Sequence, residues 1–274
     1  MVVVAAILCI FACLTAVNLI GRAADAQGYT RQLWLAGGGF VSGGAIWATH
    51  FVAMLAFRPE LPFGYDIRLT IASVFIAISL CWLGLQVALL SSLTTGPGDP
   101  AQATRKHVIG IKRGGAIIAA IGGAIMGCAI ASMHFVGMAA LRVPGELHWD
   151  GHYVLASIVI GIVGGGLAIR TILGANSVRN RVLGGGLLVL AICGLHFTAM
   201  SAVTIELNPT IAIPDAVLDP KWLAVSIAII TILIVALALT CAMVDRHLAL
   251  RSAQEEKRLR AHIVELEAAQ LRLE

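Results

Sequence analysis

Seven long apolar stretches, separated by short polar segments, run along this chain of 274 residues. Each has about 20 residues or more, enough for a helix to cross a hydrocarbon core roughly 30 Å thick. Because the stretches are continuously apolar rather than alternating, they exclude a soluble enzyme fold and an outer-membrane barrel. The sequence therefore predicts an all-α, polytopic membrane protein with a seven-transmembrane helix bundle. The predicted spans are 1–20, 33–57, 69–92, 114–141, 153–173, 182–205 and 222–244.

The distribution of Lys and Arg between the loops predicts the orientation of the bundle. Loops one, three and five carry nine basic residues near the span ends, whereas loops two, four and six carry four. By the positive-inside rule, the N-terminus lies outside and the C-terminus lies in the cytoplasm of a bacterial cell, with the bundle in its inner membrane. The net charge of +4 follows from this topology and indicates no nucleic-acid partner.

One motif recurs in the second, fourth and sixth spans. Segments 45–56, 129–140 and 191–202 share the pattern Ala-Ile-x-small-x-His-Phe-x-small-Met-x-Ala without a gap. The motif spans alternate with plain ones, so the pattern predicts a threefold helical-hairpin repeat. The predicted topology places all three motifs at one depth near the outer face. Small-residue pairs that favour close helix packing occur in spans two, four and five, at Gly39/Gly43, Gly123/Gly127 and Gly161/Gly165.

The histidine and methionine of each motif are candidate metal ligands. Residues four apart lie on one face of a helix, so each repeat presents an imidazole beside a thioether. These two donors suit Cu(I), and the motif faces carry no carboxylate for calcium or magnesium. The sequence therefore predicts copper as the cofactor. The predicted ligands are His50, Met54, His134, Met138, His196 and Met200, with Met133 either a further ligand or a packing residue.

Each of these residues also has a purely structural interpretation. An intramembrane histidine can hydrogen-bond a neighbouring helix, and methionine fills gaps in apolar cores. The fixed offset in three repeats favours a shared site. All six cysteines fall inside predicted spans and are interpreted as packing residues; Cys193, on the face of His196, is a soft ligand or a packing residue. The cysteines are Cys9, Cys13, Cys81, Cys128, Cys193 and Cys241.

The segment Met133-His134-Phe135-Val136-Gly137-Met138, with its two degenerate copies, resembles the MHYT domain, a bacterial integral-membrane sensor module. The resemblance covers about residues 1–250. It implies a signalling module that binds copper through the motif histidines and methionines and senses oxygen, carbon monoxide, nitric oxide or redox state. The tyrosine of the motif is replaced by Phe51, Phe135 and Phe197, so the ligands must come from histidine and methionine alone.

The charged segment 245–274 follows the predicted sensor domain of residues 1–244. Apolar residues at heptad spacing, including Leu259, Ile263, Leu266 and Leu273, predict a cytoplasmic signalling helix that is either a short coiled coil or a solvated amphipathic helix. The chain has no phosphate-binding glycine loop, nucleophile elbow or HExxH motif, so it is predicted not to be an enzyme. Signal output would then pass through a homodimer or a cytoplasmic partner.

Three other functions remain open at the level of sequence. Stacked histidine and methionine sites are compatible with a copper transporter, although the inner halves of the spans offer few further ligands. Histidines at one depth could also clamp the iron of a bis-His haem. In the plainest alternative, the protein is a membrane anchor whose histidines only join helices.

Overall fold

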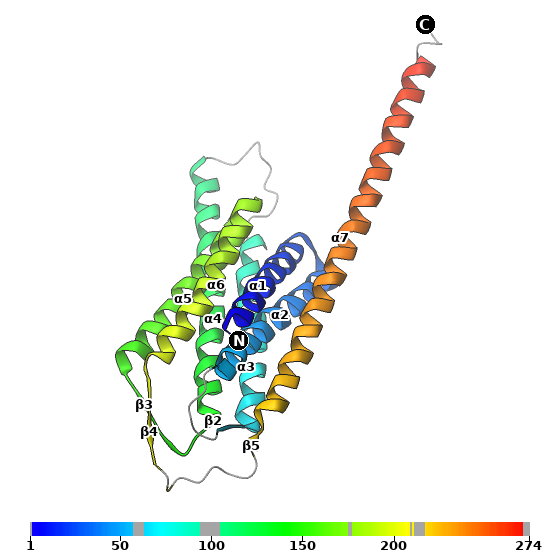
Figure 1. Cartoon of the computed structure of the whole chain (residues 1–274). Helices are drawn as coiled ribbons and strands as arrows, with labels where there is room; N and C mark the ends of the chain where they lie inside the picture. The colour runs from blue at the N-terminus through cyan, green and yellow to red at the C-terminus, as the bar shows by residue number, and fades with distance from the viewer. Residues whose placement is uncertain are drawn as a thin grey trace. The chain divides into compact units, whose positions relative to one another are not determined.

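The structure, a computed structural model, describes residues 2–56, 63–93, 105–174, 177–208, 210 and 217–270. Seven helices in these ranges are long and apolar enough to cross a membrane, which confirms the predicted helical class (Figure 1). They begin and end within a few residues of the predicted spans. The helices are α1 (Val2–Asp25), α2 (Gly28–Ala56), α3 (Ile67–Leu93), α4 (Arg105–Ala139), α5 (Gly151–Gly174), α6 (Val178–Met200) and α7 (Pro220–Gln270).

Two helices end earlier than the sequence predicts. The fourth and sixth spans were expected to run to residues 141 and 205, but α4 ends at Ala139 and α6 ends at Met200. The residues that follow form the strands β2 (Leu141–Arg142) and β4 (Val203–Leu207). Segment 203–207 is rich in β-branched residues, which suit a strand as well as an apolar span, so hydropathy alone could not separate the two.

All five strands lie in the connections that follow α2, α4 and α6. Strands β1 (Gly64–Asp66), β2 and β5 (Val217–Leu218) form an antiparallel sheet in the order β2-β1-β5. Each strand of this sheet comes from the connection after a different motif helix. Strand β3 (Gly145–Trp149) pairs with β4 in a second sheet. The strands therefore mark one end of the bundle, called here the strand end (Figure 1).

The expected small-residue contacts are present between neighbouring helices. A Cβ atom added at Gly39 would lie 2.7 Å from Trp82 Cβ of α3, and one added at Gly43 would overlap the α3 backbone at Ile78. Likewise, Gly123 faces Gly165 and Gly127 faces Gly161, with backbone meeting backbone between α4 and α5. No side chain fits between these helices, so their packing distance is set by glycine.

Replacing Gly127 with valine is expected to lower the stability of the bundle. The added side chain would overlap the carbonyl of Gly161, and overpacking of this kind costs about 1–3 kcal/mol. The apparent melting temperature in detergent measures the effect. The matched control is Gly186→Val in α6, where an added Cβ meets nothing within 4 Å. Equal melting temperatures for the two variants would contradict the close packing of α4 and α5.

Asp66 begins α3 and also joins it to β2. Its Oδ1 accepts hydrogen bonds from the backbone N–H groups of Arg68 and Leu69, as an N-cap does. Its Oδ2 accepts a hydrogen bond from Arg142 Nη2 at 2.9 Å. The hydrogen bond from Leu69 N–H, together with the Arg142 guanidinium, holds the pKa of Asp66 below its ordinary value of 3.8. The folded state therefore favours the ionised carboxylate.

Substituting Asp66 with alanine is expected to cost about 1 kcal/mol of stability, because the N-cap of α3 is lost. Since the pKa is lowered on folding, this stabilisation is present above the ordinary value and is lost as the pH falls through the folded-state value. Apparent melting temperatures measured from neutral pH down to acid pH test this. In the Asp66→Asn variant, the new side chain caps the helix without titrating, so this variant should retain stability but lose the pH dependence.

The chain divides into two compact units, one ending at Ile234 and the other beginning at Val235. The first contains the sheets and the helices from α1 to the early part of α7. In the second unit, α7 continues as a helix to Gln270. Leu273 lies outside the described residues. The predicted change of domain at residue 244 and the coiled-coil interpretation of the tail stay predictions.

Candidate metal centre

The three motif histidines lie near the ends of parallel-running helices. His50 is six residues before the end of α2, His134 five before the end of α4, and His196 four before the end of α6. Each helix leads into a connection at the strand end. The repeat therefore brings its histidines to one level, as the motif spacing predicted.

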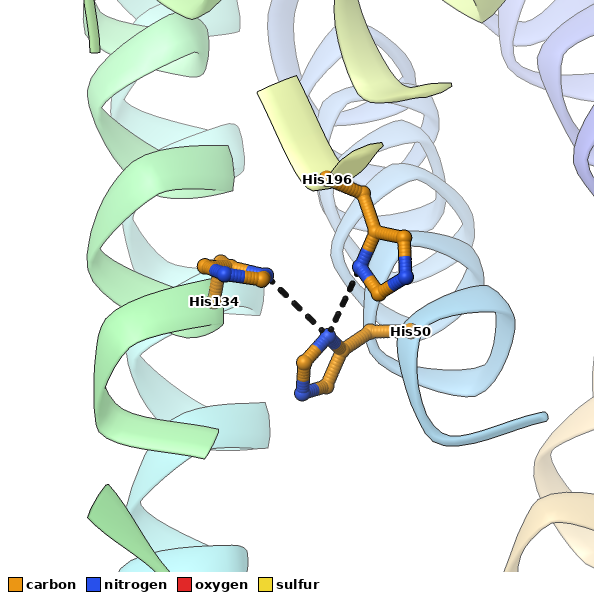
Figure 2. Close-up of side chains that lie close together, drawn as sticks. All are labelled: His50, His134 and His196. Atoms are coloured by element: carbon orange, nitrogen blue, oxygen red, sulfur yellow. Dashed lines mark hydrogen bonds between the residues drawn. The ribbon is translucent and has the colours of Figure 1, made fainter. Parts of the chain in front are cut away.

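The three imidazoles meet around His50. Its Nδ1 lies 3.2 Å from His134 Nδ1 and 3.3 Å from His196 Nδ1 (Figure 2). The ring planes are close to perpendicular, with interplanar angles of 78–85° among the three pairs. One nitrogen of each ring lies within 4.8 Å of the others, so the three histidines are close enough to hold a metal ion. His50 and His134 are buried and His196 is half-buried.

Hydrogen bonding among the rings cannot satisfy this arrangement. A neutral imidazole nitrogen offers a single in-plane site, which is either an N–H donor or a lone pair. His50 Nδ1 therefore cannot form full hydrogen bonds to both neighbours at once. Imidazole nitrogens bound at about 2.0–2.1 Å to one tetrahedral ion lie about 3.3–3.4 Å apart. The observed spacings around His50 match that value, so these residues fit a metal ion better than they fit one another.

The position of His50 is fixed by its neighbours. Its ring packs edge-on against Phe51, and its Nε2 is buried with no hydrogen-bond partner among the described residues. On α4, a Cβ atom added at Gly137 would lie 2.7 Å from this Nε2. Gly137 occupies the second small position of the motif, between His134 and Met138. A glycine there lets the His50 ring approach His134.

A cavity of about 70 Å³ adjoins the three histidines. One water-sized molecule needs roughly 10–15 Å³ of such volume, so the cavity has room for a molecule of a few atoms. Its walls come from α1, α2, α4 and α6 and are almost entirely apolar, with Thr49 and Cys193 among the few exceptions. The apolar lining residues are Val2, Ala5, Ala6, Ile46, Ala53, Ile130, Met133, Ile192, Leu195 and Phe197.

The predicted methionine ligands differ in their relation to this cavity. Met133 is buried and lines it. Met54 and Met138 are buried in the core and Met200 is half-buried against it, and none of these three is among the lining residues. A ligand role for the methionines stays a prediction.

Sequence reasoning did not find two features near the histidines. Gly137 as a spacer for His50 was hidden in the small column of the motif, where the other repeats have Ala53 and Ala199. The second is a contact between the thiols of Cys9 and Cys193. These residues are 184 positions apart in the chain, and no spacing rule links them. The alternation of helix directions could have indicated that α1 and α6 run antiparallel.

Comparison with protein families gives three matches to one repeat. The family model described as MHYT, bacterial signalling protein N terminal repeat, matches residues 43–97, 127–185 and 190–254. Each match begins six or seven residues before a motif histidine. It therefore recovers the threefold repeat, with a frame that starts in the motif helix and continues into the next one.

Several similar proteins are signalling proteins. An uncharacterized signaling protein of Caulobacter vibrioides is 35% identical over 86% of this chain, which covers 26% of that protein. In Pseudomonas aeruginosa, the bifunctional diguanylate cyclase/cyclic di-GMP phosphodiesterase MucR is 32% identical over 90% of the chain, covering 34% of MucR. The cyclic di-GMP phosphodiesterase NbdA is 30% identical over 70%, covering 22% of NbdA.

This chain thus spans about a quarter to a third of the length of these relatives. No solved structure matches it. The repeat matches, the seven apolar helices and the histidine cluster agree with one another, and together they fit a multi-pass protein of the bacterial inner membrane. The chain belongs to the MHYT family and is a sensor module of the kind found in bacterial membrane signalling proteins.

Proposed function

We propose that this sensor module binds copper at His50, His134 and His196 and responds to a diatomic gas, namely oxygen, carbon monoxide or nitric oxide, or to redox state. The observation that carries the proposal is the meeting of three Nδ1 atoms around His50 beside an apolar cavity. Apolar surroundings make an ionisable group costly, so an unshared histidine cluster is expected to serve a function.

The donor set supports Cu(I) as the metal. Imidazole and thioether are ligands that copper accepts, and no carboxylate of the described residues lines the cavity. A monovalent ion bound by neutral ligands also brings less charge into the apolar interior than a divalent ion does. Met133 is the first candidate for a thioether ligand, because it lines the cavity. Met54, Met138 and Met200 are the further candidates.

The size and lining of the cavity support a small neutral ligand. A volume of about 70 Å³ accommodates a diatomic molecule, and the apolar walls offer little to a charged or strongly polar one. Copper, when bound, would supply a coordination position for such a ligand. The residues of this chain orient the imidazoles, exclude water and limit the ligand by size.

The output of the module is proposed to leave through α7. The Lys and Arg distribution places the C-terminus in the cytoplasm, and MucR and NbdA are named for the synthesis and breakdown of cyclic di-GMP. We propose that ligand binding shifts the helices between two packings and that α7 passes the change to a cytoplasmic signalling partner or across a homodimer. Such a shift requires different ligand affinities in the two states.

The geometry weighs against haem at this site. Two histidines that clamp one iron from opposite sides place their nitrogens about 4 Å apart, twice an Fe–N bond of about 2 Å. Here the nitrogens around His50 are 3.2 and 3.3 Å apart, and a cavity of about 70 Å³ is far below the size of a macrocycle. Transport of copper is the remaining alternative, and uptake of copper by vesicles that carry the protein would favour it.

Infrared spectroscopy of the reduced protein tests both halves of the proposal. Wild type loaded with Cu(I) is expected to bind copper and, under carbon monoxide, to give one band of a metal-bound carbonyl. The triple variant His50→Ala/His134→Ala/His196→Ala is expected to lose the copper and the band. A copper-loaded wild type with no carbonyl band would contradict gas binding, whereas a triple variant that keeps its copper would contradict the site itself.

A further inference from the structure

Three cysteine thiols from two helices gather beside the histidine cavity. Cys9 and Cys13 of α1 are 1% and 4% exposed, and Cys193 of α6 is half-buried in the cavity wall. The thiol of Cys9 hydrogen-bonds with those of both Cys13 and Cys193. Cys9 therefore lies at the centre of the group, and all three thiols are free.

The packing of α1 on α6 places Cys9 and Cys193 together independently of that contact. Ala5 and Ala6 share the histidine cavity with Ile192 and Cys193. Further along, Ile10 and Cys13 share a second pocket with residues 182–190 of α6. The two helices thus run antiparallel, and ascending positions of α1 meet descending positions of α6. Cys9, between these two levels, faces the segment that ends in Cys193.

Disulfide geometry selects one pair from the three thiols. A disulfide requires Cβ atoms about 3.5–4.5 Å apart. Cys9 and Cys13 are four apart on one helix, where Cβ atoms are about 5–6 Å apart, so they cannot be bridged without distorting α1. The pair between the helices, Cys9 and Cys193, carries no such restriction.

We propose that Cys9 and Cys193 form a redox-active thiol pair that closes to a disulfide between α1 and α6. Two S–H bonds break and one S–S bond forms, while two electrons and two protons pass to a neutral two-electron acceptor, the class that includes quinones and diazenes. The dithiol and the disulfide are both uncharged, so neither state leaves a charge in the apolar interior. The cross-link joins one wall of the histidine cavity to α1, and its formation does not depend on a metal at the histidines.

Thiol counting in a two-cysteine variant tests the pair. Cys13, Cys81, Cys128 and Cys241 are replaced by alanine in the full chain, and detergent-solubilised protein is treated with the diazene diamide, denatured and labelled with maleimide-polyethylene glycol. Two labels are expected before oxidation, none after it, and two again after dithiothreitol. The matched control keeps Cys9 and Cys81 instead and is expected to retain both labels. Persistence of two labels in the Cys9/Cys193 protein, or their equal loss from the control, would overturn the proposal.

Mass spectrometry of oxidised wild type guards against misfolding of the multiple variant. A disulfide-linked peptide pair that contains Cys9 and Cys193 is expected after diamide treatment and digestion without reductant. A linkage of Cys13 to Cys193, or six unlinked thiols, would overturn the assignment.

Discussion

His50→Ala is expected to abolish stoichiometric metal binding, with an effect larger than that of any change outside the three histidines. His50 Nδ1 is the atom that both other Nδ1 atoms approach, so its loss leaves His134 and His196 without their shared neighbour. Changes to groups that only support metal ligands cost about 10–100-fold in affinity, so removal of a central ligand should cost at least about 100-fold. Elemental analysis of purified protein and competition with a Cu(I) chelator measure the loss.

The control for this variant is a histidine at the same end of the bundle. His152, near the start of α5, is fully exposed and pairs with Asp150, so His152→Ala should leave the metal content unchanged. If His50→Ala kept its metal, or if both variants lost it equally, the three histidines would not form the binding site.

Gly137→Ala is expected to weaken metal binding by about 10–100-fold without removing a single candidate ligand, as changes to supporting groups do. The added Cβ would lie 2.7 Å from His50 Nε2 and 3.1 Å from His50 Cδ2, closer than side chains tolerate. Because the His50 ring is buried against Phe51, it must shift and carry Nδ1 away from its neighbours. The same chelator competition measures the change.

Alanine at this position tests geometry rather than stability. It is a better helix former than glycine, and the other two repeats already have alanine there, at Ala53 and Ala199. The matched control is Gly185→Ala in α6, where the added Cβ meets Val17 Cγ2 at an ordinary 3.5 Å. Unchanged affinity in Gly137→Ala, or an equal loss in Gly185→Ala, would show that the close approach to His50 does not govern the site.

The helices of this protein were predictable because membrane spans depend on length and hydropathy, which are local properties. The predicted spans and the observed helices agree closely at the ends marked by polar residues, such as Asp25 and Gly151. Agreement fails at Ala139 and Met200, where the apolar sequence continues past the end of the helix into a strand. Pairing of β1 with β2 and β5 joins segments about 75 residues or more apart, and hydropathy carries no information about such contacts.

The histidines of the candidate site were predictable for a different reason. Their repetition at one offset in helices of one direction forces them to one level, whatever the details of packing. Which of the other side chains face the centre depends on helix rotation, which the repeat does not fix. Hence Met133 lines the cavity while Met54, Met138 and Met200 do not line it. The contact between Cys9 and Cys193 depends on the neighbour relation of α1 and α6, which is a property of the assembled bundle.

The small sheet β2-β1-β5 ties the three repeats into one mechanical body. Each motif helix is followed by one strand of this sheet, so a sliding motion of α2, α4 or α6 alone would shear backbone hydrogen bonds that all three share. The expected displacement is therefore concerted, with the three helices moving as a set. Strand β5 ends at Leu218, and α7 begins at Pro220, so the first turn of α7 is fastened to the same sheet that holds the ends of the histidine helices.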